Sequence, residues 1–219
     1  MPQIENDLMK FIDQTPNAYI CVDNLSKILI ADGFQQLYEN ENWANLLPNG
    51  KYFVVRNDSS LIAFKLCNNT QNIGFNIVST HIDSPSFSIK PNADIFDNTY
   101  LKLNVSEYGS LLYYSWLDRP LSLSGRVITY SNGVYEKQLL NIDKDLLIIP
   151  SQALHINREA NRKNELNCQI DMLPIISLSN TKMLDDIIRE SILIKYVTMI
   201  YIFIIEINLK KLGYKKNLF

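Results

Sequence analysis

Between Pro91 and about residue 178, the chain consists of short runs of β-branched and aromatic residues that are separated by turn residues. These runs include "YLKLNVSEY", "SLLYYSW", "LSLSGRVITY" and "DLLIIP". The clearest turn is Asn132-Gly133, which separates "VITY" from "VYEKQLL" and tolerates the positive φ of a tight hairpin. The pattern predicts a β-rich module over residues 92–178.

The first 91 residues predict two helices, a hairpin and a further strand. Ile4, Leu8, Phe11 and Ile12 share one face of a helix that ends before Pro16. A second helix over "CVDNLSKILIADG" ends at the glycine, a usual left-handed cap. "KYFVVRNDSSLIAFKL" is typical of a hairpin, and "IGFNIVST" predicts a short, buried central strand.

Composition excludes several classes of function. The 219 residues carry a formal net charge of −2, so no basic field favours nucleic acid or an anionic membrane. Cys21, Cys67 and Cys168 lie far apart, which favours free thiols in a reducing cytoplasm. The start, "MPQIENDLMKF", has no pattern of a signal peptide. The apolar run over 196–205 has about half the length of a bilayer-spanning helix, so we predict a cytoplasmic protein without a membrane anchor.

The chain has two histidines, and the first lies in "STHIDSP" directly after an apolar run. In an extended segment, His81 and Asp83 point to the same face, so the carboxylate can reach the ring. Such a contact fixes the tautomer and leaves the other nitrogen for a metal. The residues alone also allow a structural histidine at a strand end. His155, beside Arg158, is locally typical of a surface or packed histidine.

Other catalytic chemistries find no support in the sequence. There is no glycine-rich phosphate loop, no Gly-x-Ser-x-Gly elbow and no histidine near Cys21 for a thiol protease. Asp118-Arg119 is interpreted as a structural ion pair beside a β turn. Metal chemistry is the main class that remains.

Several motifs occur together in one order: "KFIDQTPNAY", "GKYFVVRNDSSLIAFKL", "STHIDSPSFSIKP", "YLKLNVSEYGS", "WLDRPLSLSGRV" and "IPSQALHINREAN". From about Leu8 to Ile176 the chain resembles the N-terminal part of the aspartyl aminopeptidase family of zinc metallopeptidases. The resemblance implies an α/β fold, a mixed-sheet catalytic domain with an inserted β-rich dimerisation domain. We therefore expect residues 1–91 and 179–219 to be parts of the catalytic domain and 92–178 to be the inserted domain.

The resemblance also implies roles for single residues. His81 matches the first metal ligand of the family, and Asp83 matches the catalytic aspartate that supports it. His155 matches a histidine that helps build the substrate site across a subunit boundary, or alternatively a metal ligand. The implied cofactor is a pair of zinc ions. The implied reaction removes N-terminal, often acidic, residues from peptides by a homo-oligomer, or by a hetero-oligomer with a longer homologue.

The chain departs from the family in ways that affect activity. Ile20 replaces a histidine, Ile82 replaces a threonine, and Gly109-Ser110 replaces a glycine pair. The later acidic ligands, the Glu-Glu pair with the general base, and the terminal histidine find no match. We expect these 219 residues to be a truncated member that is inactive alone. The alternative is a non-enzymatic dimerisation fragment that pairs with a full-length homologue.

The end of the chain predicts a reading-frame change. The family resemblance continues through "TKMLDDIIRE" and then fades. If the bases that encode "IIEINLKK" are read one nucleotide out of frame, they can give "YNRNKPKK". Such a stretch, with lysines and a tyrosine, suits the family at this place. We therefore expect the segment from about residue 195 to Phe219 to be an out-of-frame product.

Overall fold

The computed structural model describes residues 3–68, 74–163, 165–178, 183–192 and 199–209, the last range by its backbone only. The chain divides into two compact units, Met1–Ser84 (unit 1) and Pro85–Phe219 (unit 2). Helices and strands are mixed, and no helix among the described residues has the length and apolar character needed to cross a bilayer.

Unit 1 begins with the two predicted helices, α1 (Gln3–Asp13) and α2 (Ala18–Ala31), which are confirmed. The Asn17 side chain caps α2, because its Oδ1 accepts a hydrogen bond from the Ile20 N–H at 3.0 Å. The turn after α2 places Gly33 at φ 82°, as the predicted left-handed end requires. Asn17 is 2% exposed, so its cap has no competition from water.

Asn17→Ala is expected to lower the free energy of unfolding of unit 1 by about 1–2 kcal/mol, because the first turn of α2 loses its acceptor. The measurement is chemical denaturation followed by the fluorescence of Trp43, which lies in unit 1. Asn45→Ala, at an exposed turn position, is the control and should change stability by less than about 0.5 kcal/mol. Equal effects of the two substitutions would contradict the capping role.

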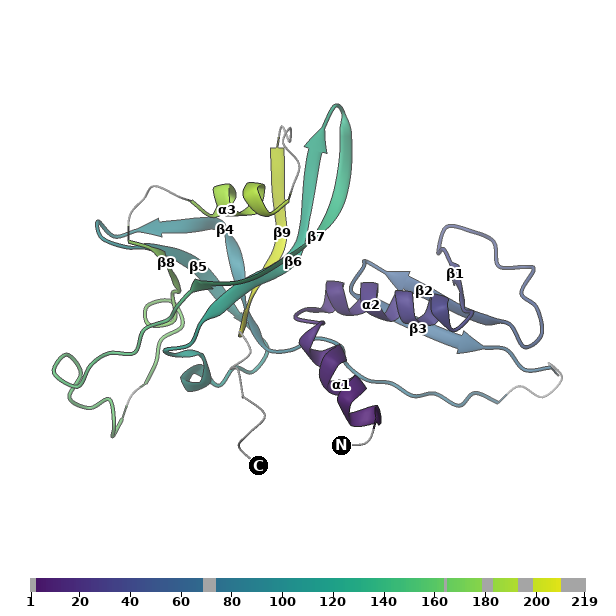
Figure 1. Cartoon of the computed structure of the whole chain (residues 1–219), viewed down its shortest axis with the longest axis horizontal. Coiled ribbons are helices and arrows are strands. Elements are labelled where there is room, and N and C mark those ends of the chain that lie inside the picture. The colour runs from purple at the N-terminus through teal and green to yellow at the C-terminus, as the bar shows by residue number, and fades with distance from the viewer. Residues whose placement is uncertain (1–2, 69–73, 164, 179–182, 193–198, 210–219) are drawn as a thin grey trace. The chain divides into compact units, whose positions relative to one another are not determined.

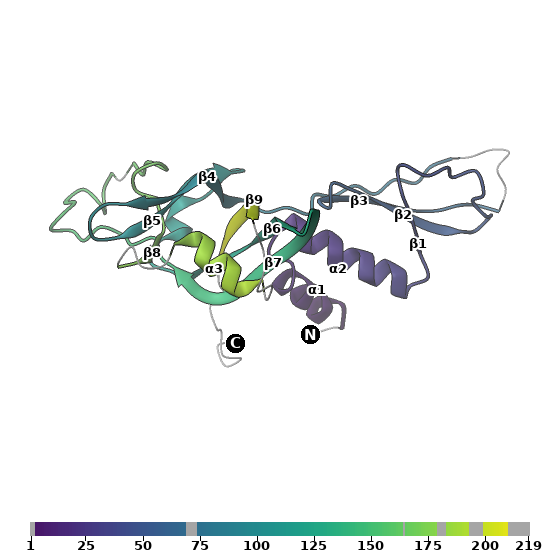
Figure 2. The ribbon, with the colours of Figure 1, turned by 90° about the horizontal axis from the view of Figure 1, so that it is seen from above.

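The sheet of unit 1 has three strands in the order β1-β2-β3, namely β1 (Gln35–Leu37), β2 (Lys51–Arg56) and β3 (Ser60–Lys65). The β2–β3 hairpin confirms the prediction, and its turn residues Asn57 and Asp58 have φ of 51° and 59°. α2 runs along this sheet in both views (Figures 1 and 2). Phe53 is fully buried and Tyr52 is 5% exposed, so β2 carries the core of the unit.

The predicted central strand over "IGFNIVST" is wrong for the described part of this segment. Residues 74–84 form no strand, and Phe75, Ile77 and Val78 are 82%, 83% and 97% exposed. A buried strand needs hydrogen-bonding neighbours and apolar cover, and the described residues of unit 1 supply neither here. Ile73 lies outside the described residues.

Unit 2 contains a six-stranded sheet in the order β7-β6-β9-β4-β5-β8, with antiparallel neighbours (Figure 1). Its elements are β4 (Ser86–Phe96), β5 (Leu101–Tyr108), the 3₁₀ helix η1 (Tyr113–Trp116), β6 (Leu121–Ser131), β7 (Val134–Leu147), β8 (Ile175–Ser177), α3 (Leu184–Ser191) and β9 (Met199–Leu209). Asn132 and Gly133 have φ of 51° and 83° and close the β6–β7 hairpin, which confirms that prediction.

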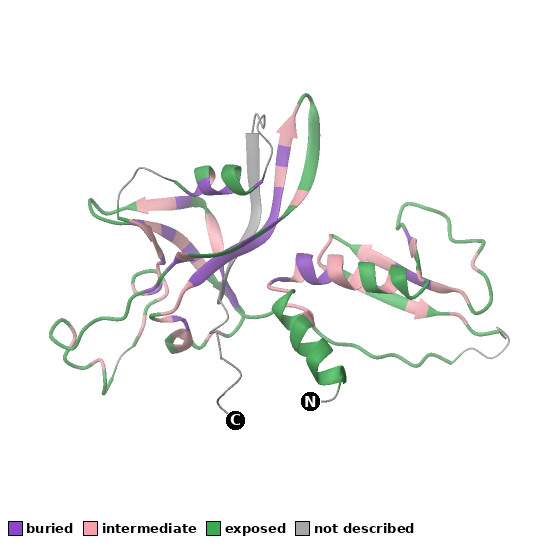
Figure 3. Cartoon of the chain, viewed as in Figure 1, coloured by how far each residue is buried: buried purple, intermediate pink, exposed green. Residues whose placement is uncertain are grey.

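One apolar core holds unit 2 together, and burial is densest along β6 (Figure 3). Alternate residues of β5 are buried, as expected for a strand with one face on the core. α3 covers this core with Leu184, Ile187 and Ile188. Unit 2 therefore has the sheet and core of an independently packed module.

The division between the units falls at Ser84 and Pro85, whereas the sequence predicted a boundary at residue 91. β4 passes through Pro91 because the ladder with β5 shifts register between Ile89 and Asp94. At such a bulge the missing proline N–H removes no ladder hydrogen bond. The assignment of 1–91, 92–178 and 179–219 to catalytic and dimerisation domains stays a prediction.

The C-terminal segment is described in part. The β9 backbone pairs with β6 from Met199 to Leu209 and with β4 at Glu206 and Ile207. Residues 193–198 and 210–219 lie outside the described residues. The out-of-frame origin of this segment stays a prediction, which the encoding DNA tests.

Candidate functional site

His81 and Asp83 lie in contact in the extended segment that ends unit 1. The His81 Nδ1 is 2.9 Å from the Asp83 carbonyl oxygen and 3.3 Å from Asp83 Oδ1. The side chains are 82% and 41% exposed. The predicted contact between the ring and the aspartate is therefore present, and its partner atoms include the backbone as well as the carboxylate.

This contact decides which ring nitrogen is free. Both neighbours of Nδ1 are oxygen acceptors, so they favour the tautomer with its proton on Nδ1. Nε2 then keeps its lone pair and can bind a metal, the arrangement in which a carboxylate or carbonyl orients a histidine ligand. The pair has the chemistry of one metal ligand with its supporting group.

One supported ligand does not make a zinc site. A catalytic zinc needs about three protein ligands, and a pair of zinc ions needs more. Within the described ranges, no group of three or more His, Cys, Asp or Glu side chains could hold a metal ion. The described residues thus do not fit a complete zinc centre, and His81 with Asp83 would supply one ligand of such a centre at most.

His155 lies in unit 2, on the exposed loop between the β7 and β8 strands. A turn holds it, because the N–H groups of Ile156 and Asn157 both donate to the Ala153 carbonyl, at 2.9 and 3.0 Å. His81 and Asp83 lie together in one unit and His155 lies in the other. The metal, catalytic and substrate roles of these three residues stay predictions.

Asp118 anchors the start of the His155 loop, a role that sequence reasoning missed. Its Oδ1 accepts a hydrogen bond from the Ser151 N–H at 2.9 Å, and its own N–H donates to the Ile149 carbonyl at 2.9 Å. Arg119 Nη1 donates to the Ser115 carbonyl at 3.1 Å. Both side chains thus bond to the backbone, and the positive φ of Asp118, 54°, is a signal visible only in the structure.

Hydrogen bonds from the Ser151 side chain and backbone lower the pKa of Asp118 below its usual value. A lowered folded pKa means that this anchor stabilises the loop above the unfolded pKa, about 3.9, and is lost as pH falls through the folded value. We expect the NMR signal of the Ser151 amide to titrate below about pH 4. Asp118→Asn, which keeps an acceptor oxygen, should abolish this titration. A Ser151 signal that titrates equally in both proteins would contradict the anchor.

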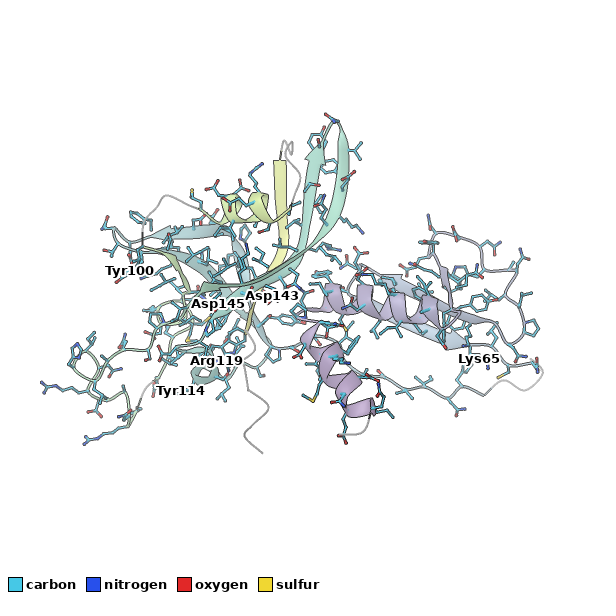
Figure 4. All side chains as sticks on the ribbon, viewed as in Figure 1. Lys65, Tyr100, Tyr114, Arg119, Asp143 and Asp145 are labelled. Atoms are coloured by element: carbon cyan, nitrogen blue, oxygen red, sulfur yellow. The ribbon has the colours of Figure 1, made fainter. Side chains whose placement is uncertain are left out.

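The same loop covers a cavity of about 620 Å³ in unit 2. Tyr100, Tyr114, Gln152 and Asn157 are among its lining residues. Figure 4 shows Tyr114 and Arg119 at the end of unit 2 from which the loop extends. The side chains that line this cavity are partly apolar, and His155 is not among them.

Tyr113, in the neighbouring η1 helix, is a structural tyrosine. Its hydroxyl donates a short hydrogen bond to Glu107, which raises the pKa of Tyr113 to about 12. The ring stacks on Phe87 with centroids 6.4 Å apart. The protonated phenol joins η1 to β5 through this hydrogen bond.

Comparison with known proteins identifies one family over most of the chain. Residues 11–207 match the family described as "Aminopeptidase I zinc metalloprotease (M18)". The match extends beyond residue 190, where the resemblance that we recognised fades. A probable M18 family aminopeptidase 2 from Clostridium acetobutylicum is 44% identical over 179 residues, which are 80% of this chain and 41% of that relative. The chain thus spans about two fifths of the length of the curated relatives it matches.

Solved structures share the fold. A cryo-EM structure of the Ape4 and Nbr1 complex aligns with a TM-score of 0.83 at 29% identity, over 92% of this chain and 43% of that chain. The S. cerevisiae mApe1 dodecamer aligns with a TM-score of 0.70 at 20% identity, over 94% of this chain and 48% of that chain, which shows the fold alone. The predicted family and the mixed α/β fold are confirmed. The chain belongs to the M18 family of zinc aminopeptidases and corresponds to part of the length of its members.

Proposed function

We propose that these residues are the N-terminal portion of a zinc-dependent aminopeptidase subunit in which His81 is a metal ligand and Asp83 holds its ring. The observation that carries the proposal is the His81 Nδ1 contact with Asp83, at 2.9 Å to its carbonyl and 3.3 Å to its carboxylate. In an M18 chain, an exposed histidine held in this way suits a ligand better than a packing residue.

The proposed reaction of the intact subunit is removal of N-terminal, preferentially acidic, residues from peptides. His155 would contribute to the substrate site across a subunit boundary, or alternatively to the metal; the family match and the exposure of its loop support this proposal. No group of three or more metal-binding side chains occurs in the part of the chain that the structure describes, so we propose that the 219 residues are inactive by themselves. A cytoplasmic location is supported by the cysteines, because Cys21, Cys67 and Cys168 are all free.

A chimera tests this function. Residues 1–178 would replace the matched part of the Clostridium acetobutylicum relative. The chimera should bind zinc and hydrolyse Asp- and Glu-anilides. His81→Ala should remove zinc and turnover, and Asp83→Asn should weaken zinc binding by about 10–100-fold. Asp7→Asn, at an exposed site on α1, is the matched control. A His81→Ala chimera that keeps zinc and activity would refute the ligand role.

A second candidate is a non-enzymatic role in which unit 2 pairs with another M18 chain. Unit 2 has its own core, and its edge strand β7 exposes Val134, Tyr135 and Leu139 at 57%, 64% and 42%. An edge strand with exposed apolar side chains is a pairing surface. The S. cerevisiae mApe1 structure is a dodecamer, which supports oligomer formation as a proposal for this chain. In this role, the partner of unit 2 is a second copy of this chain or a longer homologue.

Co-purification with the full-length Clostridium relative tests the second candidate. A complex that Tyr135→Lys weakens would support pairing through β7. Lys137→Ala leaves the apolar surface of this strand intact and is the control. Absence of any complex with the relative, together with an unassociated chain, would exclude this role.

A further inference from the structure

Asp118 fixes the chain at the point where the buried core of unit 2 ends and the loop that carries His155 begins. Its N–H donates to the Ile149 carbonyl at 2.9 Å, and its Oδ1 accepts a hydrogen bond from the Ser151 N–H, also at 2.9 Å. Pro150, which lies between these two partners, has no N–H to donate. One residue therefore bonds to the backbone on both sides of the proline.

Burial changes sharply across this anchor. Ile149 is fully buried, whereas residues 151–155 are all exposed. Within the described ranges, the stretch that follows Ser151 up to His155 makes hydrogen bonds only within its own turn, at the Ala153 carbonyl. The anchor is therefore the hydrogen-bonded link between the core of unit 2 and the turn that holds the histidine.

The far end of the loop is fixed at a greater distance along the chain. The Gln169 Nε2 donates to the Val105 carbonyl at 3.1 Å, and Gln169 lies fourteen positions after His155. Ser151 lies only four positions before the histidine. Each residue between a fixed point and a side chain adds backbone freedom. The anchor at Ser151 therefore has the greater influence on where the His155 ring lies.

The backbone of Asp118 indicates that its side chain is what matters at this position. Its φ is 54°, in the left-handed region. Glycine adopts this conformation readily, whereas a residue with a side chain adopts it at some cost in free energy, which is smaller for aspartate than for most others. A position whose backbone favours glycine thus carries an aspartate, and this aspartate bonds to Ser151 through its carboxylate.

We propose that Asp118 is a positioning residue for His155. The inference rests on the proposed function, in which His155 contributes to the substrate site. Asp118 does not touch the substrate; it acts through Ser151 and orders the root of the loop before the substrate arrives. Binding then does not have to order this segment, so the substrate binds more tightly than it would to a mobile loop. Loss of the anchor therefore raises KM, while kcat and the zinc content stay unchanged.

The first measurement uses the full 219-residue chain and needs no activity. Nitrogen-15 relaxation gives the order parameter of the His155 amide, which Asp118→Gly should lower to below about 0.6, the range of flexible backbone. This substitution keeps the left-handed backbone and removes the carboxylate. Asp118→Asn keeps an acceptor oxygen and should preserve the wild-type order parameter. Asn98→Gly, at another exposed residue with positive φ, 71°, is the matched control and should change nothing at His155.

The second measurement uses the chimera of residues 1–178 with the Clostridium acetobutylicum relative. Asp118→Gly should raise KM for Asp-anilide by about 10–100-fold, the effect expected for a hydrogen bond to a charged group. Its kcat should stay within about twofold of the wild-type value, because the chemical step is not affected. Asp118→Asn should restore KM to nearly the wild-type value, and Asn98→Gly should leave KM unchanged.

The outcomes separate this inference from the proposed function. An active chimera whose KM does not respond to Asp118→Gly overturns the inference alone, and so does a His155 order parameter that this substitution leaves unchanged. Loss of zinc, or a fall in kcat at constant KM, also overturns it, because the anchor would then act on the metal or on the chemical step. A wild-type chimera that binds no zinc and has no activity overturns the proposed function, and this inference with it.

Discussion

The purified 219-residue chain is expected to hydrolyse Asp- and Glu-anilides no faster than buffer, at least about 10⁶-fold more slowly than an intact enzyme. The reason lies in the ligand count. His81 is one of two histidines in the whole sequence, and the described residues include no cluster of three or more metal-binding side chains. Without a bound metal in a complete site, neither the attacking water nor the substrate carbonyl is activated.

The intact Clostridium acetobutylicum relative, assayed at the same zinc concentration, is the positive control for this experiment. The His81→Ala chain is the negative control, because residual turnover from a contaminating peptidase would survive this substitution. Turnover by the wild-type chain that His81→Ala abolishes would show that these residues form a working site and would contradict the account.

The largest stability effect is expected for Phe87→Ala, which should lower the free energy of unfolding of unit 2 by about 3–5 kcal/mol. Phe87 is fully buried, and its ring meets Trp116 edge-on with centroids 5.1 Å apart and an interplanar angle of 82°. The substitution removes this contact and leaves a cavity between β4 and η1. Phe87 and Trp116 both belong to the core of unit 2.

Trp116 also supplies the measurement. The chain has two tryptophans, Trp43 in unit 1 and Trp116 in unit 2, so a Trp43→Phe background isolates the signal of unit 2. Denaturant unfolding of this protein with and without Phe87→Ala gives the stability difference. Tyr135→Ala, at a residue that is 64% exposed, is the control and should change stability by less than about 1 kcal/mol. A Phe87→Ala effect as small as that of Tyr135→Ala would contradict the packing described for this core.

Local chemistry explains which elements could be predicted from the sequence. The turns at Asn132-Gly133 and at Asn57-Asp58 need positive φ, and these residue types adopt it readily, so both hairpins were predictable. The end of α1 before Pro16 and the turn at Gly33 also follow from backbone preferences of single residues. Each of these signals lies within a few residues of the structure it determines.

Features that depend on distant residues were not predictable. Pro91 indicated a boundary, because the sequence does not show that β5 pairs across a bulge there. The apolar pattern at Phe75, Ile77 and Val78 predicted burial, but burial also requires neighbouring strands. The apolar pattern indicates that these three side chains are suited to burial. The described residues of unit 1 supply no neighbouring strand that would bury them.

In the candidate site, too, contacts between residues close in sequence were predictable and contacts between distant segments were not. The contact between His81 and Asp83 spans two residues and was predictable from the geometry of an extended chain. The anchor between Asp118 and Ser151 joins segments 33 residues apart and was not. The metal role of His81 and the substrate role of His155 rest on the family resemblance, because the groups that would complete either site are not close in sequence.

Zinc stoichiometry tests the central claim most directly. The chain would be exchanged by gel filtration into zinc-free buffer after saturation with zinc, and its metal content would then be measured by mass spectrometry. An isolated histidine with its supporting carboxylate should retain far less than one zinc ion per chain, because the described ranges contain no group of three or more metal-binding side chains. Retention of one or two zinc ions per chain, lost in His81→Ala, would contradict the account.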